Sequence, residues 1–462
     1  MFRLRDYQER LASECKDKIR EYKICILNGE VRTGKTLTSI AIAANYNDVL
    51  FVTKIKAIPD IKFAYVCYWF FISNNYTDCN KFFSACKSIG LSIDYSIKLS
   101  IDYKLFNNPT YKKNELFTSF DNCFKLTIIN YESLHKIQGV FDLVICDESH
   151  SIAAFPKPSK RTKAVKQFVS NDLLLLTGTL LPESNAQIFH QLWISPHSPY
   201  KHLKNFYAWH KTFGTPKLIY TSYGTSNDYS VVDYEKVKTT IDKLKVSITQ
   251  KEAGFETSIN VKTLSCEMKP ETKKIMNKLR KDKVVVGSNS SIVADTPTKL
   301  MQKLHQLSSG TIIVDNHDDE QTSKGVIIDN SKIEFIKQKF PNKKLALFYF
   351  YKQERKMIFD SFKEDVTDDL SEFNTTDKHI ALQQVSGAEG INLSAADVLI
   401  FINFGFSNTK FIQAKDRLTT KDRKHNDVYF ILSDDGIDKQ VYKSVCNKKD
   451  YVLKTFIRDE GK

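Results

Sequence analysis

The sequence predicts an α/β protein with parallel sheets, and three observations support this fold class. Short apolar runs that suit buried strands alternate with helix-like segments in the N-terminal part; the runs lie at 24–27, 49–53, 126–130, 142–146 and 173–177. The first run leads through a glycine-rich loop straight into a helix-like segment. Further apolar runs predict a second sheet, at 345–350, 379–384, 398–402 and 428–432. Because parallel strands need crossover connections, usually helices, we expect two layered α/β lobes.

The segment between the two sets of strands breaks this alternation. Aromatic residues and loop-forming glycines cluster there, and only 233–244 looks helical. We therefore predict a first lobe at 1–196, a connecting, mainly helical subdomain at 197–257 and a second lobe at 258–462. Within the second lobe the pattern predicts helices at 272–281 and 297–307, irregular or hairpin-like segments at 282–296 and 308–330, and an exposed helix from Lys352.

The glycine-rich loop fits the phosphate-binding pattern G-x-x-x-x-G-K-[ST]. Its members are Gly29, Glu30, Val31, Arg32, Thr33, Gly34, Lys35 and Thr36. The glycines let backbone N–H groups point at phosphate oxygens, next to the positive end of the following helix. We expect Lys35 to reach the β- and γ-phosphates and Thr36 to offer its hydroxyl to Mg²⁺. The alternative is a chance glycine turn before a helix.

A pair of adjacent carboxylates, Asp147 and Glu148, follows the apolar run 141–146. The carboxyl-terminal edge of a parallel sheet is where α/β proteins bind ligands. We expect Asp147 to hold the magnesium ion and Glu148 to position and deprotonate an attacking water. The alternative is an ordinary helix N-cap pair.

Together with His150, these carboxylates form Asp-Glu-x-His, which resembles the second signature of superfamily-two helicases and translocases. The resemblance implies two RecA-like lobes with an ATP cleft between them. It also implies roles for residues that match other motifs of the family. Arg5 and Gln8 would contact the nucleotide, with Gln8 recognising adenine. Lys54, Lys56 and Asn130 would contact nucleic acid, and His150, Thr177, Gly178 and Thr179 would couple hydrolysis to nucleic-acid movement.

The C-terminal part adds two motifs that resemble the Swi/Snf-like branch of this superfamily. Residues 386–393 resemble its Gly-Ile-Asn-Leu element, which implies a nucleic-acid contact from Ser386 and a nucleotide contact from Gly390. Residues 413–417 resemble the Gln-Ala-x-x-Arg start of its last motif. Compact viral and phage helicases of this branch are the most similar, notably at 130–135 and 156–161.

Two positions depart from the pattern of that branch. Thr420 stands where the last motif has its second arginine, so Arg417 or Arg423 is expected to supply the arginine finger that stabilises charge on the γ-phosphate. Leu180 stands where a proline usually follows the Thr-Gly-Thr motif.

The composition agrees with a polyanionic partner. The net charge is +14, from 68 Lys and Arg against 54 Asp and Glu. Nine scattered cysteines without a C-x-x-C pair predict a reducing compartment and no zinc site. The start of the sequence has Arg3, Arg5 and Asp6 and no apolar core, which is unlike a signal peptide. The most apolar stretch is too short to span a bilayer, so a cytoplasmic location is expected.

The sequence therefore predicts an ATP- and Mg²⁺-dependent motor on single-stranded, forked or duplex DNA, with replication or recombination proteins as further candidate partners. Three alternatives stay open. The chain could translocate on duplex DNA without separating strands. It could be a nucleotide-gated nucleic-acid-binding module with little hydrolysis, as the loss of arginine at Thr420 suggests. RNA could replace DNA as the track.

Overall fold

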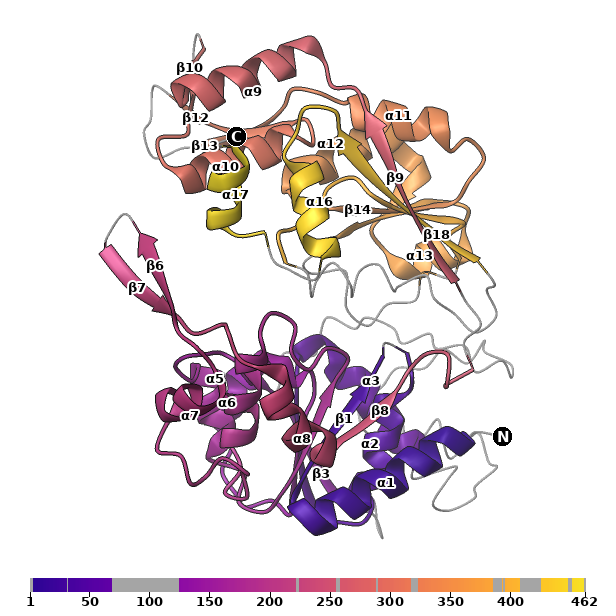
Figure 1. Cartoon of the computed structure of the whole chain (residues 1–462). Helices are drawn as coiled ribbons and strands as arrows, with labels where there is room; N and C mark the ends of the chain where they lie inside the picture. Colours follow the sequence, from indigo (N-terminus) through magenta and orange to yellow (C-terminus); the bar gives the residue numbers. More distant parts are fainter. Residues whose placement is uncertain are drawn as a thin grey trace. The chain divides into compact units, whose positions relative to one another are not determined.

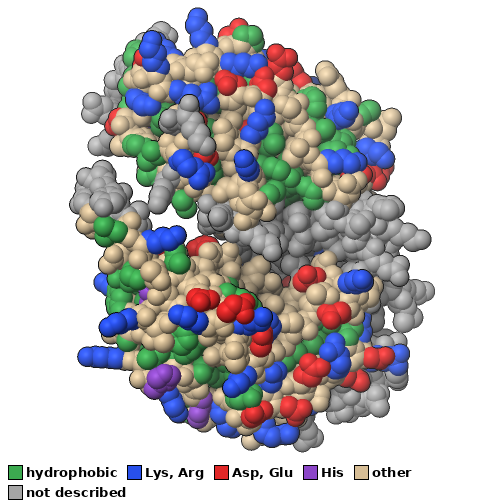
Figure 2. Space-filling view, viewed as in Figure 1, with side chains coloured by type: hydrophobic (Ala, Val, Ile, Leu, Met, Phe, Trp, Pro, Cys, Tyr) green, Lys and Arg blue, Asp and Glu red, His purple; other side chains and the backbone are tan. Residues whose placement is uncertain are grey.

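The chain forms two compact units, Met1–Phe255 and Glu256–Lys462, which we call the first and second lobes (Figure 1). The computed structural model describes residues 3–30, 32–68, 124–221, 224–254, 258–287, 290–316, 323–384, 393, 395–407, 425–447 and 451–460. On the face shown in Figure 2, basic side chains lie on both lobes and are interspersed with acidic ones.

The first lobe contains a six-stranded parallel sheet in the order β3-β2-β4-β5-β1-β8. The strands are β1 (Ile24–Gly29), β2 (Asp48–Thr53), β3 (Lys125–Asn130), β4 (Leu143–Cys146), β5 (Asp172–Thr177) and β8 (Lys245–Ile248). The five predicted strands are confirmed. The edge strand β8 was not predicted, because a four-residue run shows no periodicity of its own.

Helices cover both faces of this sheet. They are α1 (Asp6–Tyr22), α2 (Lys35–Ala43), α3 (Ile58–Cys67), α5 (Lys160–Lys166), α6 (Ile188–Trp193), α7 (Phe206–Phe213) and α8 (Tyr234–Leu244). Alternation along β1 explains the two cores: Cys25 and Leu27 pack with α1 to α3, whereas Ile24 and Ile26 pack with α5 to α8. The hairpin of β6 (Lys217–Thr221) and β7 (Gly224–Asp228) extends from this lobe in Figure 1.

The second lobe contains another six-stranded parallel sheet, in the order β15-β16-β14-β17-β18-β9. Its strands are β9 (Ser258–Cys266), β14 (Leu345–Tyr349), β15 (Val366–Thr367), β16 (His379–Gln383), β17 (Val398–Phe401) and β18 (His425–Ser433). A separate antiparallel sheet comprises β10 (Val284–Val286), β11 (Ser290–Val293), β12 (Thr311–Asn316) and β13 (Ser323–Ile327). The prediction of two parallel-sheet α/β lobes is therefore confirmed.

Helices of the second lobe also lie on both sides of its parallel sheet. They are α9 (Pro270–Asp282), α10 (Pro297–Leu307), α11 (Ser331–Lys339), α12 (Lys352–Phe362), α13 (Leu370–Thr375), α16 (Asp438–Cys446) and α17 (Leu453–Glu460). The prediction of an exposed helix from Lys352 is wrong: Glu354, Met357, Ile358 and Phe362 of α12 are all buried. Their spacing gives the helix an apolar face that packs on the sheet.

Candidate functional site

The strand order of the first lobe arranges the predicted site residues along one edge of the sheet. Because all six strands are parallel, their carboxyl ends share that edge. From one side to the other, the strand ends bring Asn130 (β3), Lys54 (just after β2), Asp147 (just after β4), Thr177 (β5) and Gly29 (β1). The carboxylates thus lie between the predicted nucleic-acid residues and the phosphate loop.

The phosphate loop is shaped by glycine and by its own polar side chains. Gly34 has a φ of 75°, and a β-carbon there would lie 2.4 Å from Nε2 of Gln8, so no larger residue fits. The buried Thr33 donates from Oγ1 to the carbonyl oxygen of Glu30 at 2.8 Å. Lys35 begins α2 and donates from Nζ to the carbonyl oxygens of Gly29 (2.6 Å) and Glu30 (3.0 Å).

Electrostatics tie Lys35 to the two carboxylates. Burial lowers the pKa of the Lys35 ammonium, and the nearby negative charges, chiefly Glu148 and then Asp147, oppose that shift. The predicted loop residue Val31 lies outside the described residues. The lysine and the carboxylate pair therefore belong to one charge cluster, as phosphoryl transfer requires.

Gln8 contacts the phosphate loop directly. Its Oε1 accepts from the backbone N–H of Arg5 at 3.0 Å, and its Nε2 donates to the carbonyl oxygen of Gly34 at 3.3 Å. Its side chain is buried, and the Arg5 guanidinium donates to the Tyr7 hydroxyl at 3.2 Å. Gln8 thus joins the start of α1 to the loop, whereas its recognition of adenine stays a prediction.

Asp147 is held by groups that its local sequence does not indicate. Its Oδ2 accepts from Thr53 Oγ1 at 2.8 Å, and its Oδ1 accepts from the Glu148 N–H at 3.0 Å. Tyr131 donates its hydroxyl to the Asp147 carbonyl oxygen at 2.6 Å. Burial, followed by the charge of Glu148, raises the pKa of Asp147 to about 6. Burial and then Asp147 raise the pKa of Asp60 on α3 to about 6 as well.

Glu148 stays ionised although it is half-buried, with 29% of its side chain exposed. Burial by itself would raise its pKa, but the His150 ring and the charges of Lys35 and Lys54 outweigh burial and lower the pKa to about 2. His150 Nδ1 lies 3.2 Å from Glu148 Oε2, close enough for an ion pair but not aligned as a hydrogen bond. The backbone at Glu148 is left-handed, with φ 49° and ψ 54°. The side chain can therefore accept a hydrogen bond from a water molecule.

The Thr-Gly-Thr motif lies against the phosphate loop. In the β1–β5 register Thr177 stands opposite Asn28, and its buried Oγ1 accepts from the Thr179 N–H at 3.0 Å. A β-carbon at Gly178 would lie 3.4 Å from the Gly29 carbonyl oxygen and 3.9 Å from Lys35 Nζ. Any shift of this motif would therefore reach the loop.

Gln191 is a buried residue of α6 that sequence reasoning missed. Its Oε1 accepts from Ser149 Oγ at 2.7 Å, and its Nε2 donates to the carbonyl oxygens of Leu180 (2.9 Å) and Gln187 (3.2 Å). It thus connects the turn after Glu148 with the turn after Thr179. The only sequence signal was an amide on the apolar face of a short helix.

The structure describes only some of the predicted nucleic-acid-binding residues. Asn130 donates from Nδ2 to Glu132 at 3.1 Å, while its buried Oδ1 has no partner among the described residues. Lys54 influences the pKa of Glu148, and Lys56 lies in the 3₁₀ turn η1 (Ile55–Ala57). Ser386, Gly390, Arg417 and Arg423 lie outside the described residues.

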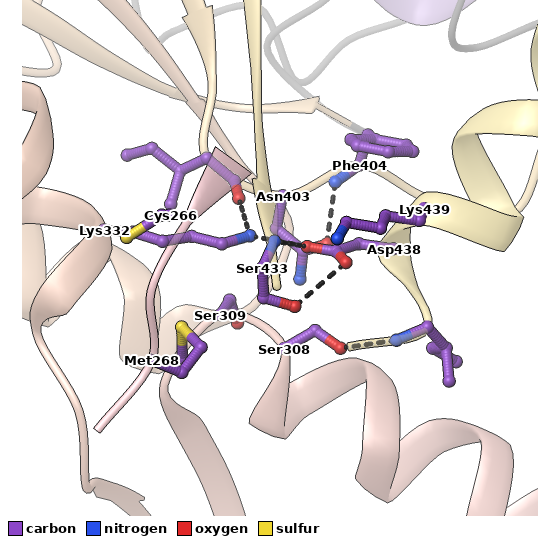
Figure 3. A network of polar contacts seen from close by, with 12 residues as sticks. Cys266, Met268, Ser308, Ser309, Lys332, Asn403, Phe404, Ser433, Asp438 and Lys439 are labelled. Atoms are coloured by element: carbon purple, nitrogen blue, oxygen red, sulfur yellow. Dashed lines mark hydrogen bonds and ion pairs between the residues drawn. The ribbon is translucent and has the colours of Figure 1, made fainter. Parts of the chain in front are cut away.

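The described part of the second lobe contributes a buried polar network at the carboxyl edge of its sheet (Figure 3). Lys332 Nζ donates to Asp438 at 2.8 Å and to the Ile402 carbonyl oxygen at 3.0 Å. Asp438 also accepts from the N–H (2.8 Å) and Oγ (3.0 Å) of Ser433. These contacts fix the ends of β17 and β18, and both members of the ion pair are 1% exposed.

Glu354 anchors a second part of this network. It accepts from the Phe350 N–H (2.6 Å), from Asn403 Nδ2 (2.7 Å) and from the Ser309 hydroxyl. Gln384, next to the end of β16, accepts from the Gly405 N–H at 2.5 Å. The network thus joins the chain before the Gly-Ile-Asn-Leu segment to the chain before the last motif.

The described residues show no other cofactor or membrane feature. No group of three or more His, Cys, Asp or Glu side chains among them could hold a metal ion. No helix within the described ranges is long and apolar enough to cross a bilayer.

Comparisons with known proteins agree with the first-lobe geometry. Residues 1–181 match the family model described as "Type III restriction enzyme, res subunit". The match covers the first lobe through the Thr-Gly-Thr motif, which is less than half of the chain. No curated protein sequence is significantly similar to the chain.

Among solved structures, the chain is similar to the Sulfolobus solfataricus SWI2/SNF2 ATPase core in complex with dsDNA. The sequence identity is 16%, the TM-score is 0.39, and the alignment covers 96% of this chain and 91% of that chain.

Proposed function

We propose that this chain is an ATP-driven DNA helicase or translocase of the Swi/Snf-like branch. One observation supports the proposal above all others. Lys35, Asp147 and Glu148 form one half-buried charge cluster, and a β-carbon at Gly178 of the coupling motif would lie 3.4 Å from the carbonyl oxygen of Gly29 in the same loop as Lys35. The alternative is that these charges serve only to stabilise the fold. A purely structural ion-pair cluster would not need an ionised carboxylate, Glu148, in a left-handed turn beside a phosphate loop.

The donor set of the first lobe fits Mg²⁺ and ATP. Magnesium prefers oxygen ligands and keeps several waters, so one carboxylate and one hydroxyl suffice beside the phosphates. Asp147 supplies a carboxylate whose pKa is raised by burial and then by the charge of Glu148, and Thr36 supplies the hydroxyl at the start of α2. The bound ion would neutralise charge on the phosphates. Glu148 would orient the water that attacks the γ-phosphate, and Lys35 would exchange its loop carbonyls for phosphate oxygens.

Three finer parts of the proposal come from the sequence. Arg417 or Arg423 supplies the positive charge that the transition state needs, and the resemblance to compact viral and phage helicases supports a role in replication, recombination or repair. Gln8 recognises adenine by exchanging its contact with Gly34 for the base.

The test is a steady-state ATPase assay with no nucleic acid, single-stranded DNA, blunt duplex, forked DNA and RNA side by side. We expect Mg²⁺-dependent hydrolysis that DNA stimulates, and Glu148→Gln should bind ATP without turning it over. A strand-displacement assay on the fork then separates helicase from duplex translocase. Nucleotide-dependent DNA binding without hydrolysis would refute the motor and favour a nucleotide-gated binding module.

A further inference from the structure

The segment after the catalytic carboxylates is basic and contains no acid. No Asp or Glu occurs between Glu148 and Asp172. The same stretch contains five exposed cations, namely Lys157, Lys160, Arg161, Lys163 and Lys166, of which the last four lie on α5. Positive charge therefore gathers on α5 and just before it, without an acidic residue in the same segment.

Two of these cations have structural partners and three have none. Arg161 forms an ion pair with Glu132 at 2.5 Å. Lys166 donates to the Trp193 carbonyl oxygen at 3.0 Å and lies 3.5 Å over the Trp193 ring. Lys157, Lys160 and Lys163 have no acidic partner within the described part of the chain. Lys160 and Lys163 stand three residues apart, on the same side of α5.

The position of α5 links these lysines to the predicted nucleic-acid residues. The helix packs against η3 (Tyr131–Lys136) and η4 (Ser149–Ile152), which follow β3 and β4 at the site edge of the sheet. Glu132 joins the two parts, because it accepts from Asn130 Nδ2 as well as pairing with Arg161. Helix α5 thus packs beside the segment that directly follows Asn130.

Hydrogen bonds also connect α5 to the catalytic turn. Ser159 caps the helix by accepting from the Thr162 N–H at 3.1 Å. The buried Thr162 donates from Oγ1 to the carbonyl oxygen of Ile152, the last residue of η4, at 2.9 Å. Since η4 begins directly after Glu148, a displacement of α5 would reach that carboxylate within one turn.

We propose that Lys157, Lys160 and Lys163 form a binding surface for the phosphates of the nucleic-acid track, and that Thr162 positions the Glu148 turn in response to its occupation. The proposal rests on the proposed function. Charge complementarity selects the partner, because three ammonium groups without an acidic partner among the described residues match a row of phosphates.

The binding test replaces all three lysines with glutamine and measures DNA affinity by fluorescence anisotropy over a series of salt concentrations. Each lost phosphate contact reduces the slope of log K against log salt by about 0.9 for duplex and about 0.7 for single strands. We expect the triple variant to lower the slope by roughly 2–3 and the affinity at low salt by about tenfold or more.

The matched control removes the same charge from a helix far along the chain. Lys274, Lys278 and Lys281 of α9 are exposed, and their triple glutamine variant should keep the parent's slope. Equal slopes for the two triple variants would overturn the surface assignment. Hydrolysis without DNA should be unchanged in the α9 control. A parent that binds DNA but never hydrolyses ATP would refute the motor and leave the binding test intact.

The coupling test uses Thr162→Val, which keeps the shape and removes the hydroxyl, with Thr162→Ser as the rescue. We expect the valine variant to bind DNA with the parent's affinity and to lose most of the DNA stimulation of kcat, about tenfold, since misplacement by a fraction of an ångström affects the chemical step. The serine variant should restore it. Parent-like stimulation in Thr162→Val would show that Thr162 does not position the turn.

Discussion

The amide of Gln191 should matter for both stability and catalysis. Gln191→Met keeps the volume but removes the acceptor of the buried Ser149 hydroxyl and the donor to the Leu180 carbonyl oxygen. Each orphaned buried group costs about 1–3 kcal/mol, so the first lobe should lose about 2–6 kcal/mol of unfolding free energy. Loss of the hydrogen bond to the Gln187 carbonyl oxygen should add little to this loss of unfolding free energy, because that carbonyl lies at a helix and keeps its backbone surroundings.

The stability effect can be measured by thermal unfolding of the full chain. For a unit of about 250 residues, 1 kcal/mol shifts Tm by about 2–4 °C, so the first-lobe transition should fall by roughly 4–24 °C. Asn45→Leu is the control, because it also removes side-chain hydrogen bonds to backbone carbonyls, those of Ala41 and Ile42, but at the exposed end of α2. It should cost under about 1 kcal/mol.

The catalytic effect follows from what Gln191 connects. Loosening the turn after Glu148 should lower kcat by about 10–100-fold while the KM for ATP stays nearly constant. A double-mutant cycle with Ser149→Ala should give a coupling energy of about 1 kcal/mol or more. Additive effects together with a parent-like kcat would show that this contact only fills space.

Further predictions concern pH, the catalytic carboxylate and the second lobe. The pKa of Asp147 is raised to about 6, so ionisation of this carboxyl destabilises the metal-free fold as pH rises through 6. Protonation of the same carboxyl weakens Mg²⁺ binding as pH falls through 6. Mg²⁺ titrations of hydrolysis at pH 5.5 and 7.5 should show the weaker binding at the lower pH, and the Asp60→Asn variant should keep this pH dependence. Glu148→Gln should reduce single-turnover hydrolysis by about 10²-fold or more and leave ATP affinity measured by calorimetry intact. Asp438→Ala should strand the buried Lys332 charge and cost the second lobe about 3–5 kcal/mol in urea unfolding, whereas a cost below about 1 kcal/mol would contradict the buried ion pair.

Local patterns were enough to predict the elements that hold the site. The strand, glycine loop and helix around Gly34 and Lys35 are contiguous, and each has its own periodicity or steric requirement, so the sequence predicted them without knowledge of the fold. The apolar run before Asp147 likewise predicted a buried strand ending in two carboxylates. The class of enzyme was predicted from the resemblance of the ordered motifs to those of a known family.

Only the tertiary structure decided which of these elements are neighbours. The order β3-β2-β4-β5-β1 places the carboxylates between Asn130 and the phosphate loop, and pairing between strands far apart in the chain leaves no local signal. The same holds for the contacts of Gln8 with Gly34, Ser149 with Gln191, and Thr162 with Ile152.

The burial of Glu354 on a helix predicted to be exposed has the same origin. A charged residue is buried where tertiary neighbours satisfy all its hydrogen bonds, and those neighbours, Ser309 and Asn403 among them, come from distant parts of the chain. Sequence periodicity therefore determined which segments fold into helices and strands, whereas long-range hydrogen bonding and packing decided which polar side chains act together.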